Sequence, residues 1–181
     1  MSETLSVATR KAITPVFMIL DNETILPASP EEVWPTLLDY PTWQNYSEVR
    51  RISGVIGEVD EVVALIKKEK GFVFPPYYAR TLKIDPPRRI VWRTFIDKGA
   101  DPIDRSGIVD FRLYPCAEGS RFCTHQYYEY LVPHDTEEEL VAFRASQEVN
   151  FRTLQAATRP KLLALIEARL GKPSASQPTA A

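Results

Sequence analysis

The stretch that decides the fold is Thr136–Leu170, TEEELVAFRASQEVNFRTLQAATRPKLLALIEARL, which has the pattern of one long amphipathic helix. Asp135 or Thr136 can cap its start, because a glutamate follows each of them at the third position, as in a capping box. Gly171 ends the helix and Pro173 prevents its continuation. Its apolar residues recur at three- and four-residue steps and form one stripe, made of Leu140, Phe143, Phe151, Leu154, Leu162 and Leu165. A helix of this length needs a large apolar surface to pack against.

Composition and charge restrict the class of protein. With 181 residues, 44% of them hydrophobic, the chain is long enough for one globular domain with a sizeable core. The net charge is -2, and no basic stripe marks a nucleic-acid surface. No apolar run reaches the roughly 18 residues that a membrane span needs, and Val16–Leu20 is too short for a signal peptide. We therefore expect a cytoplasmic protein with no nucleic-acid partner and no membrane span.

Most of the chain before the long helix has the pattern of β-strands. Alternating apolar residues, separated by Gly and Pro turn signals, predict strands at 14–28, 49–55, 59–68, 77–85, 89–97, 108–114 and 120–132. The first of these is expected to be interrupted at Asp21-Asn22. The short turns predict antiparallel hairpins. We expect residues 1–13 to be a flexible arm, 14–171 to form a single domain and 172–181 to be a disordered tail.

A second informative segment, Ala28–Trp43, follows the first strand and reads ASPEEVWPTLLDYPTW. Ser29 is a favourable helix cap, and Pro30 fits the first helical position because no helical partner exists there for an amide hydrogen. Pro41 ends this helix. A second short helix is expected around Thr42–Tyr46.

Alternation along the later strands predicts which side chains face the long helix. On each strand the more apolar set of alternate residues is turned inward, since one face of such a sheet is buried. The inward sets are Tyr78, Arg80, Leu82 and Ile84; Ile90, Trp92, Thr94 and Ile96; Val109, Phe111 and Leu113; and Phe122, Thr124, Gln126, Tyr128, Tyr130 and Val132.

Several segments resemble a known superfamily. ASPEEVW at 28–34, followed by Leu38, Asp39, Tyr40 and Trp43, resembles the opening of the SRPBCC superfamily, the START-like or birch-pollen-allergen-like helix-grip proteins. The likeness is greatest to the branch of polyketide cyclase/dehydrase and lipid transport proteins. Asp85–Arg93 is similar to the proline turn and tryptophan strand of that branch. The resemblance implies an α+β helix-grip fold, in which an antiparallel sheet of about seven strands curls around the long C-terminal helix. It also implies two short helices after the first strand and a mostly apolar cavity.

The inward-facing side chains would line that cavity. Aromatic walls with a few polar groups are usual for a small-molecule pocket, although the same residues could pack as a filled core. A buried Arg80 would need an anionic partner such as a ligand acid, whereas a shift of its strand would bring it to solvent. The candidate ligand-binding residues are Tyr78, Arg80, Trp92, Thr94, Phe111, Gln126, Tyr128, Asn150, Phe151 and Leu154.

Metal and cofactor chemistry have little support in the sequence. Cys123, His125 and Glu129 share one strand face, but it is the apparent outer face, and His134 follows in a distant loop. These residues do not make a four-ligand zinc site. We expect no metal and no cofactor, and no disulfide between Cys116 and Cys123.

The function that this reading predicts is the binding of a small hydrophobic or aromatic molecule in an internal cavity. One alternative is a polyketide cyclase or dehydratase that acts on a ligand in the same cavity, with Tyr128 or Arg80 polarising a carbonyl. Another is a protein-interaction module similar to a chaperone co-activator, which predicts a filled core and an exposed apolar patch. No residue pair has the spacing of a known catalytic unit, so no catalytic residue is assigned. The sequence does not determine the ligand or the oligomeric state.

Overall fold

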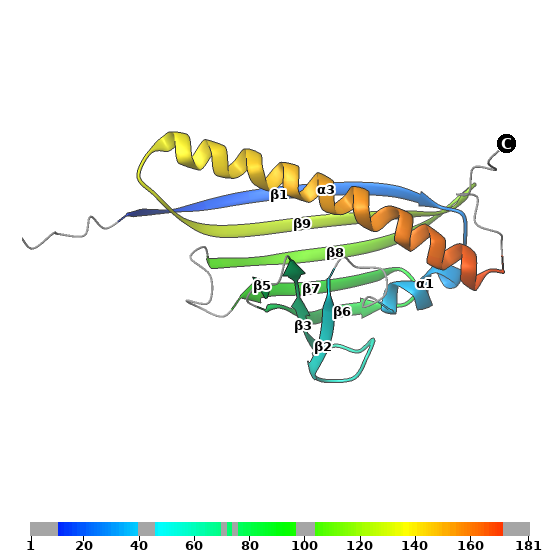
Figure 1. Cartoon of the computed structure of the whole chain (residues 1–181). Coiled ribbons are helices and arrows are strands. Elements are labelled where there is room, and N and C mark those ends of the chain that lie inside the picture. Colours follow the sequence, from blue (N-terminus) through cyan, green and yellow to red (C-terminus); the bar gives the residue numbers. More distant parts are fainter. Residues whose placement is uncertain (1–10, 40–45, 70–71, 74–75, 97–103, 172–181) are drawn as a thin grey trace, which may run out of the picture.

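The computed structural model describes residues 11–39, 46–69, 72–73, 76–96 and 104–171. In this part of the chain, seven strands form one antiparallel sheet in the order β1-β9-β8-β7-β6-β3-β2 (Figure 1). Two short strands, β4 and β5, pair separately. The elements are β1 (Ala12–Leu26), α1 (Pro30–Leu38), β2 (Glu48–Ser53), β3 (Val62–Ile66), β4 (Lys68–Glu69), β5 (Phe72–Val73), β6 (Tyr77–Asp85), β7 (Arg89–Ile96), β8 (Asp104–Cys116), β9 (Gly119–His134) and α3 (Glu137–Arg169).

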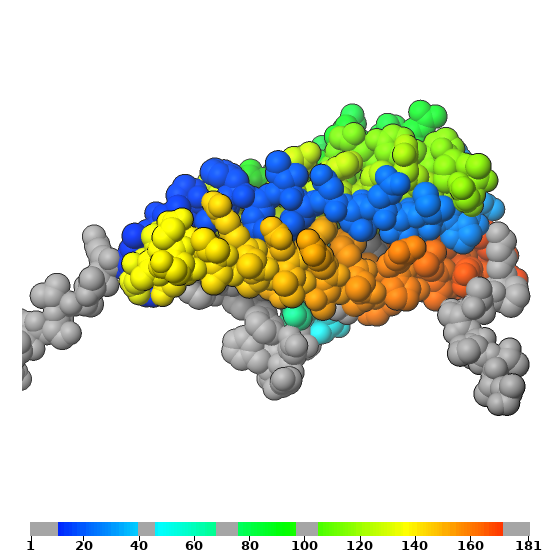
Figure 2. Space-filling model, turned by 90° about the horizontal axis from the view of Figure 1, so that it is seen from above, coloured from blue at the N-terminus to red at the C-terminus, as the bar shows by residue number. Residues whose placement is uncertain are grey.

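Helix α3 lies over one face of the sheet, which we call the inner face; the opposite face is the outer face. It contacts β1, β9 and α1, and Figure 2 shows α3, in yellow to orange, alongside β1, in blue. Thr136 caps the helix as predicted, because its hydroxyl accepts a hydrogen bond from the amide of Glu139 at 3.3 Å. No helix in the described ranges is both long and apolar enough to cross a membrane.

The packing of α3 is strong at its two ends and weak between them. Near the start, Leu140 is buried in a cluster with residues of β1 and β9. Near the end, Leu162 and Ile166 join the main core, which includes Val33 and Leu37 of α1. None of the residues from 141 to 161 is buried. The helix therefore bridges the sheet, and its middle is free to form one wall of a cavity.

The predicted strands are present, with corrected bounds. The expected interruption of the first strand at Asp21-Asn22 is wrong, because β1 pairs with β9 in an unbroken register from Ala12 to Leu26. Partners outweigh the low strand propensity of these residues: Asp21 accepts from His125 at 2.9 Å and Asn22 donates to Gln155 of α3 at 3.0 Å. The predicted second short helix falls mainly on residues 40–45, outside the described ranges, as do most of the predicted arm and the predicted tail.

The predicted inner face of β6 is wrong. Tyr77, Ala79 and Thr81 are buried there, whereas Tyr78 and Arg80 lie on the outer face. The reason is a β-bulge between Thr81 and Lys83, where the register with β7 shifts by one residue. The prediction assumed that side chains alternate without a break along β6. Because the bulge adds one residue, that assumption places the residues before it on the wrong face of the sheet.

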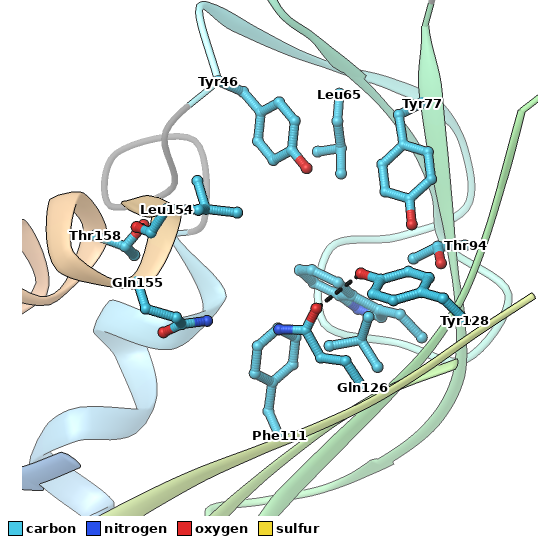
Figure 3. A pocket seen from close by; sticks show the side chains of 12 residues that line it. Tyr46, Leu65, Tyr77, Thr94, Phe111, Gln126, Tyr128, Leu154, Gln155 and Thr158 are labelled. Carbon is cyan, nitrogen blue, oxygen red and sulfur yellow. Dashed lines mark hydrogen bonds between the residues drawn. The ribbon is translucent and has the colours of Figure 1, made fainter. Parts of the chain in front are cut away.

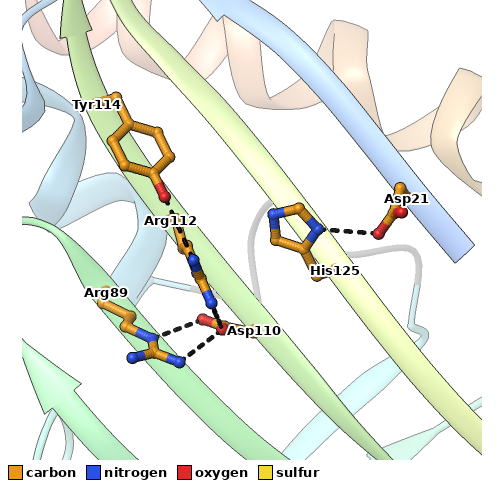
Figure 4. A network of polar contacts seen from close by, with 6 residues as sticks. All are labelled: Asp21, Arg89, Asp110, Arg112, Tyr114 and His125. Atoms are coloured by element: carbon orange, nitrogen blue, oxygen red, sulfur yellow. Dashed lines mark hydrogen bonds and ion pairs between the residues drawn. The ribbon is translucent and has the colours of Figure 1, made fainter. Parts of the chain in front are cut away.

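A charged network lies on the outer face of the sheet (Figure 4). Asp110 is 4% exposed and accepts hydrogen bonds from Arg89 and Arg112, the shortest at 2.7 and 2.6 Å. Burial by itself would raise the pKa of Asp110, but the hydrogen bonds from the two guanidinium groups outweigh it and lower the pKa below its usual value. This outward-facing carboxylate is thus a structural tie between β7 and β8.

Substitution of Ile166 tests the attachment of the end of α3. Ile166 is fully buried, so Ile166→Ala should lower the free energy of unfolding by about 3 kcal/mol through lost burial and a cavity. Val149 is 62% exposed on the same helix, so Val149→Ala should change stability by less than about 0.5 kcal/mol. Urea unfolding measures both, and equal effects would contradict the two-ended attachment.

Asp110→Asn tests the charged network. The folded-state pKa of Asp110 is lowered, so its carboxylate stabilises the fold above the unfolded pKa of about 3.9, and this is lost as pH falls through the folded pKa. The variant should lose about 2 kcal/mol at pH 7, and the deficit should shrink below about pH 4. Asp60→Asn is the matched control, because Asp60 pairs with Arg80 in solvent and such pairs contribute little. A deficit independent of pH in urea unfolding would contradict the role of the charge.

Candidate functional site

A cavity lies between the middle of α3 and the inner face of the sheet (Figure 3). Its volume is about 70 Å³, the volume of about two molecules of liquid water and about half that of a protein cavity that binds benzene. Of the described residues, those that line it are Tyr46, Leu65, Tyr77, Trp92, Thr94, Val109, Phe111, Gln126, Tyr128, Leu154, Gln155 and Thr158. The wall is mostly aromatic and aliphatic, with a few hydroxyl and amide groups.

Strand register places these side chains in rows across the sheet. Trp92 of β7 pairs with Val109 of β8, which pairs with Gln126 of β9. The Trp92 and Phe111 rings meet edge to face, with centroids 5.0 Å apart. These neighbouring strands form an apolar floor, and Figure 3 shows the side chains of Leu154, Gln155 and Thr158 on α3 across from it.

The next row, Thr94–Gly107–Tyr128, depends on the glycine at its centre. A Cβ atom added to Gly107 would lie 2.4 Å from Cδ1 of Tyr128 and 2.5 Å from the backbone oxygen of Tyr127. The ring of Tyr128 therefore lies directly against the bare backbone of β8. Only glycine allows this approach, which keeps the Tyr128 ring over the sheet and its hydroxyl at the cavity.

The sheet and Tyr46 contribute four hydroxyl groups and one amide to the cavity wall, and α3 contributes the hydroxyl of Thr158 and the amide of Gln155. The Tyr128 hydroxyl donates to Oε1 of Gln126 at 2.8 Å. The hydroxyls of Tyr77 and Thr94 are buried and make no hydrogen bond of good geometry in the described protein, although the Tyr77 hydroxyl lies near enough to that of Tyr128 to interact with it; the two residues are only 7% and 1% exposed. Tyr46 contributes the fourth hydroxyl. Two of these groups are thus available to a guest molecule.

Burial raises the pKa of two tyrosines of the cavity, Tyr128 and Tyr46. It raises the pKa of Tyr128 well above its usual value, and the nearby hydroxyls of Tyr77 and Tyr46 raise it further. Burial, reinforced by Tyr77, also raises the pKa of Tyr46. Near neutral pH these two groups donate hydrogen bonds and do not act as bases.

The structure brings together part of the predicted site. Trp92, Thr94, Phe111, Gln126, Tyr128 and Leu154 line the cavity. Tyr78 and Arg80 do not, which corrects their predicted position: Tyr78 stacks on Phe95 with centroids 5.4 Å apart, and Arg80 pairs with Asp60 at 2.7 Å. Asn150 is exposed and Phe151 half-buried, and neither is a lining residue.

Other lining residues were missed by the sequence analysis, for identifiable reasons. Tyr77 was assigned to the wrong face because of the bulge in β6. Gln155 and Thr158 lie near Leu154 on α3, but a search for an apolar stripe passes over polar residues. Tyr46, Leu65 and Val109 complete the missed set; of these, Val109 was assigned to the inner face but not to the site.

The strand face considered for a metal carries other contacts. His125 pairs with Asp21, and the thiol of Cys123 lies 3.8 Å from a carboxylate oxygen of Glu23. In the described residues no group of three His, Cys, Asp or Glu side chains is arranged to hold a metal ion. Cys116 and Cys123 are both free thiols.

Gly107→Ala tests the contact that positions Tyr128. The added methyl group would overlap the Tyr128 ring and the backbone oxygen of Tyr127, so the variant should lose about 2 kcal/mol of stability. Ser106→Ala is the control, because Ser106 precedes Gly107 and faces the other side of β8; it should change stability by less than about 0.5 kcal/mol. Thermal unfolding measures both. A neutral Gly107→Ala variant would show that the close approach is not needed.

Comparisons with solved structures agree on the fold. No protein-family model and no curated protein matches the chain. A protein of Chromobacterium violaceum is similar with a TM-score of 0.59 at 17% identity, covering 82% of this chain and 96% of that one. A protein of unknown function from Staphylococcus aureus gives a TM-score of 0.65 at 12% identity, covering 87% and 98%. The structure of Ara h 8.0201 gives 0.58 at 11% identity, covering 84% and 99%. With its seven-stranded antiparallel sheet and long C-terminal helix, the chain has the helix-grip fold that the sequence predicts.

Proposed function

We propose that the chain binds a small hydrophobic or aromatic molecule in the cavity under α3. The observation that carries this proposal is the pair of buried hydroxyls on Tyr77 and Thr94, which have no hydrogen bond of good geometry among the described residues and lie in a mostly apolar cavity. A buried polar group without a hydrogen bond costs about 1–3 kcal/mol. A guest with an apolar body and one oxygen atom would satisfy these hydroxyls while burying its own surface at about 25 cal/mol per Å². Gln126 and Tyr128 would help to orient it.

The size of the cavity favours a compact guest. About 70 Å³ is about half the volume of a protein cavity that binds benzene, so one ring needs a small outward movement of the middle of α3. A lipid or a polyketide chain would need a larger movement. Such a movement would break the hydrogen bond from Asn22 to Gln155 but little apolar packing, because no residue from 141 to 161 is buried.

The alternative of a cyclase or dehydratase has less support. The cavity could fold a flexible substrate, and the neutral Tyr128 hydroxyl could polarise a carbonyl. Proton abstraction needs a base, however, and the described lining residues include no carboxylate and no histidine. Ligand binding without a reaction accounts for the same cavity residues and does not require a base.

The alternative of a protein-interaction module has one observation in its favour. Its predicted apolar patch matches exposed residues on the outer face of β1 and β9, including Phe17 at 69% and Ile19 at 68% exposure. It also predicts a filled core, and the cavity counts against that. We propose a cytosolic location, which is supported by the two free thiols.

Toluene and p-cresol, which differ by one hydroxyl, test the proposal. Both should bind the wild-type chain, and p-cresol should bind about fivefold more tightly because its hydroxyl bonds with Tyr77 or Thr94. The double variant Tyr77→Phe/Thr94→Val should lose this preference and keep toluene binding. Calorimetry gives the affinities, and NMR shifts at Trp92 locate the guest.

Tyr127→Phe is the control, since Tyr127 is next to Tyr128 but 47% exposed on the outer face; it should preserve the preference for p-cresol. If neither compound binds or shifts the signals of Trp92, the cavity is not a binding site and the proposed function is wrong.

A further inference from the structure

Arg105 places a positive charge beside the cavity. It belongs to β8, pairs with Tyr130 of β9 and lies two residues before Gly107, on the inner face. Its guanidinium carbon is 4.1 Å from the centre of the Tyr77 ring. Because Tyr77 lines the cavity, the guanidinium lies directly next to a lining residue, although Arg105 is not itself one.

The charge of Arg105 is not balanced by a carboxylate in the described part of the chain. Its side chain is half-buried and interacts with the hydroxyl of Tyr130, but its Nε atom is buried without a hydrogen-bond partner among the described residues. Two arginines of the outer face do have a carboxylate partner, because Arg89 and Arg112 share Asp110. Isolated burial of a cation is unfavourable unless something compensates it.

The contact with Tyr77 compensates only in part. The electrons of the Tyr77 ring attract the flat face of the guanidinium. The N–H donors of the guanidinium point outward within its plane, so they still need hydrogen-bond acceptors. Burial alone would lower the pKa of Arg105, but Tyr77, Tyr130, Tyr128 and Tyr46 raise it above its usual value, so the group stays charged. A planar carboxylate at the free edge would accept from two of these donors at once.

We propose that the ligand of this cavity is a hydrophobic or aromatic acid whose anionic group binds Arg105 while its apolar body occupies the space over Trp92 and Phe111. This inference rests on the proposed function, because it assigns the chemical class of the guest. The competing explanation is structural: Arg105 only holds the Tyr77 ring in place. In that case the loss of Arg105 would affect neutral and acidic guests equally.

Toluene and 4-methylbenzoate separate these explanations, since they share one ring and one methyl group and differ by the carboxylate. At pH 7 the wild-type chain should bind 4-methylbenzoate at least about tenfold more tightly than toluene, as charge-assisted hydrogen bonds predict. Arg105→Met keeps an apolar side chain of similar reach and should abolish this preference while toluene binding stays within about twofold. Arg105→Lys keeps the positive charge but not the planar guanidinium, so it should retain part of the preference for 4-methylbenzoate.

Arg93→Met is the matched control. Arg93 is an exposed arginine on the neighbouring strand β7, on the outer face, so its loss should leave both affinities unchanged. Circular dichroism confirms that each variant is folded. The comparison of the two guests on the wild-type chain shows whether the cavity prefers an anion even if Arg105→Met does not fold, and Arg105→Lys then tests whether the preference depends on Arg105.

Three results would overturn the inference, and they are distinguishable. If toluene binds and 4-methylbenzoate binds no more tightly, the cavity takes neutral guests and only the role of Arg105 fails. If Arg105→Met weakens both guests equally, the arginine is structural. If neither guest binds the wild-type chain, the proposed function fails with the inference.

Discussion

The cavity exists because α3 has buried apolar contacts with the rest of the protein near its two ends and not between them, where the hydrogen bond from Asn22 to Gln155 joins it to β1. Leu140 is buried against β1 and β9, and Leu162 and Ile166 are buried against α1 and the main core. A helix of 33 residues held at both ends spans the distance as a stiff rod, so its middle need not follow the twisted surface beneath it. The side chains on the inner face of the sheet therefore line the space beneath the middle of α3. Two strong hydrophobic contacts thus determine where a site can be.

Backbone register then determines the chemistry of that space. The rows Trp92–Val109–Gln126 and Thr94–Gly107–Tyr128 run across three strands, so apolar and polar side chains alternate by row. Gly107 lets the Tyr128 ring lie on the backbone, close to the hydroxyls of Tyr77 and Thr94. The result is an apolar cavity with one polar end, a combination that selects for a guest with an apolar body and one polar group.

Arginine residues have different surroundings on the two faces of the sheet. On the outer face, Arg89 and Arg112 share the buried carboxylate of Asp110, and their charges serve stability. On the inner face, Arg105 has an aromatic ring beneath it and no described carboxylate beside it. The first arrangement is complete within the described protein, whereas the second would be completed, in our proposal, by the anion of a bound ligand. Position in the sheet, and not residue type, separates a structural arginine from a candidate binding arginine.

The sequence by itself determined the fold: the long C-terminal helix, the antiparallel strands and the inward faces of β7, β8 and β9 all follow from local periodicity, capping and turn signals. It therefore also located much of the cavity wall, including Trp92, Phe111 and Tyr128. Only the tertiary structure decided which arginine lies inside, because the bulge in β6 turns Arg80 outward and the pairing of β8 with β9 extends that strand back to include Arg105. Alternation is a local property of one strand. A bulge or a strand end is decided by hydrogen bonds to neighbouring strands that are distant in sequence, and no local pattern records them.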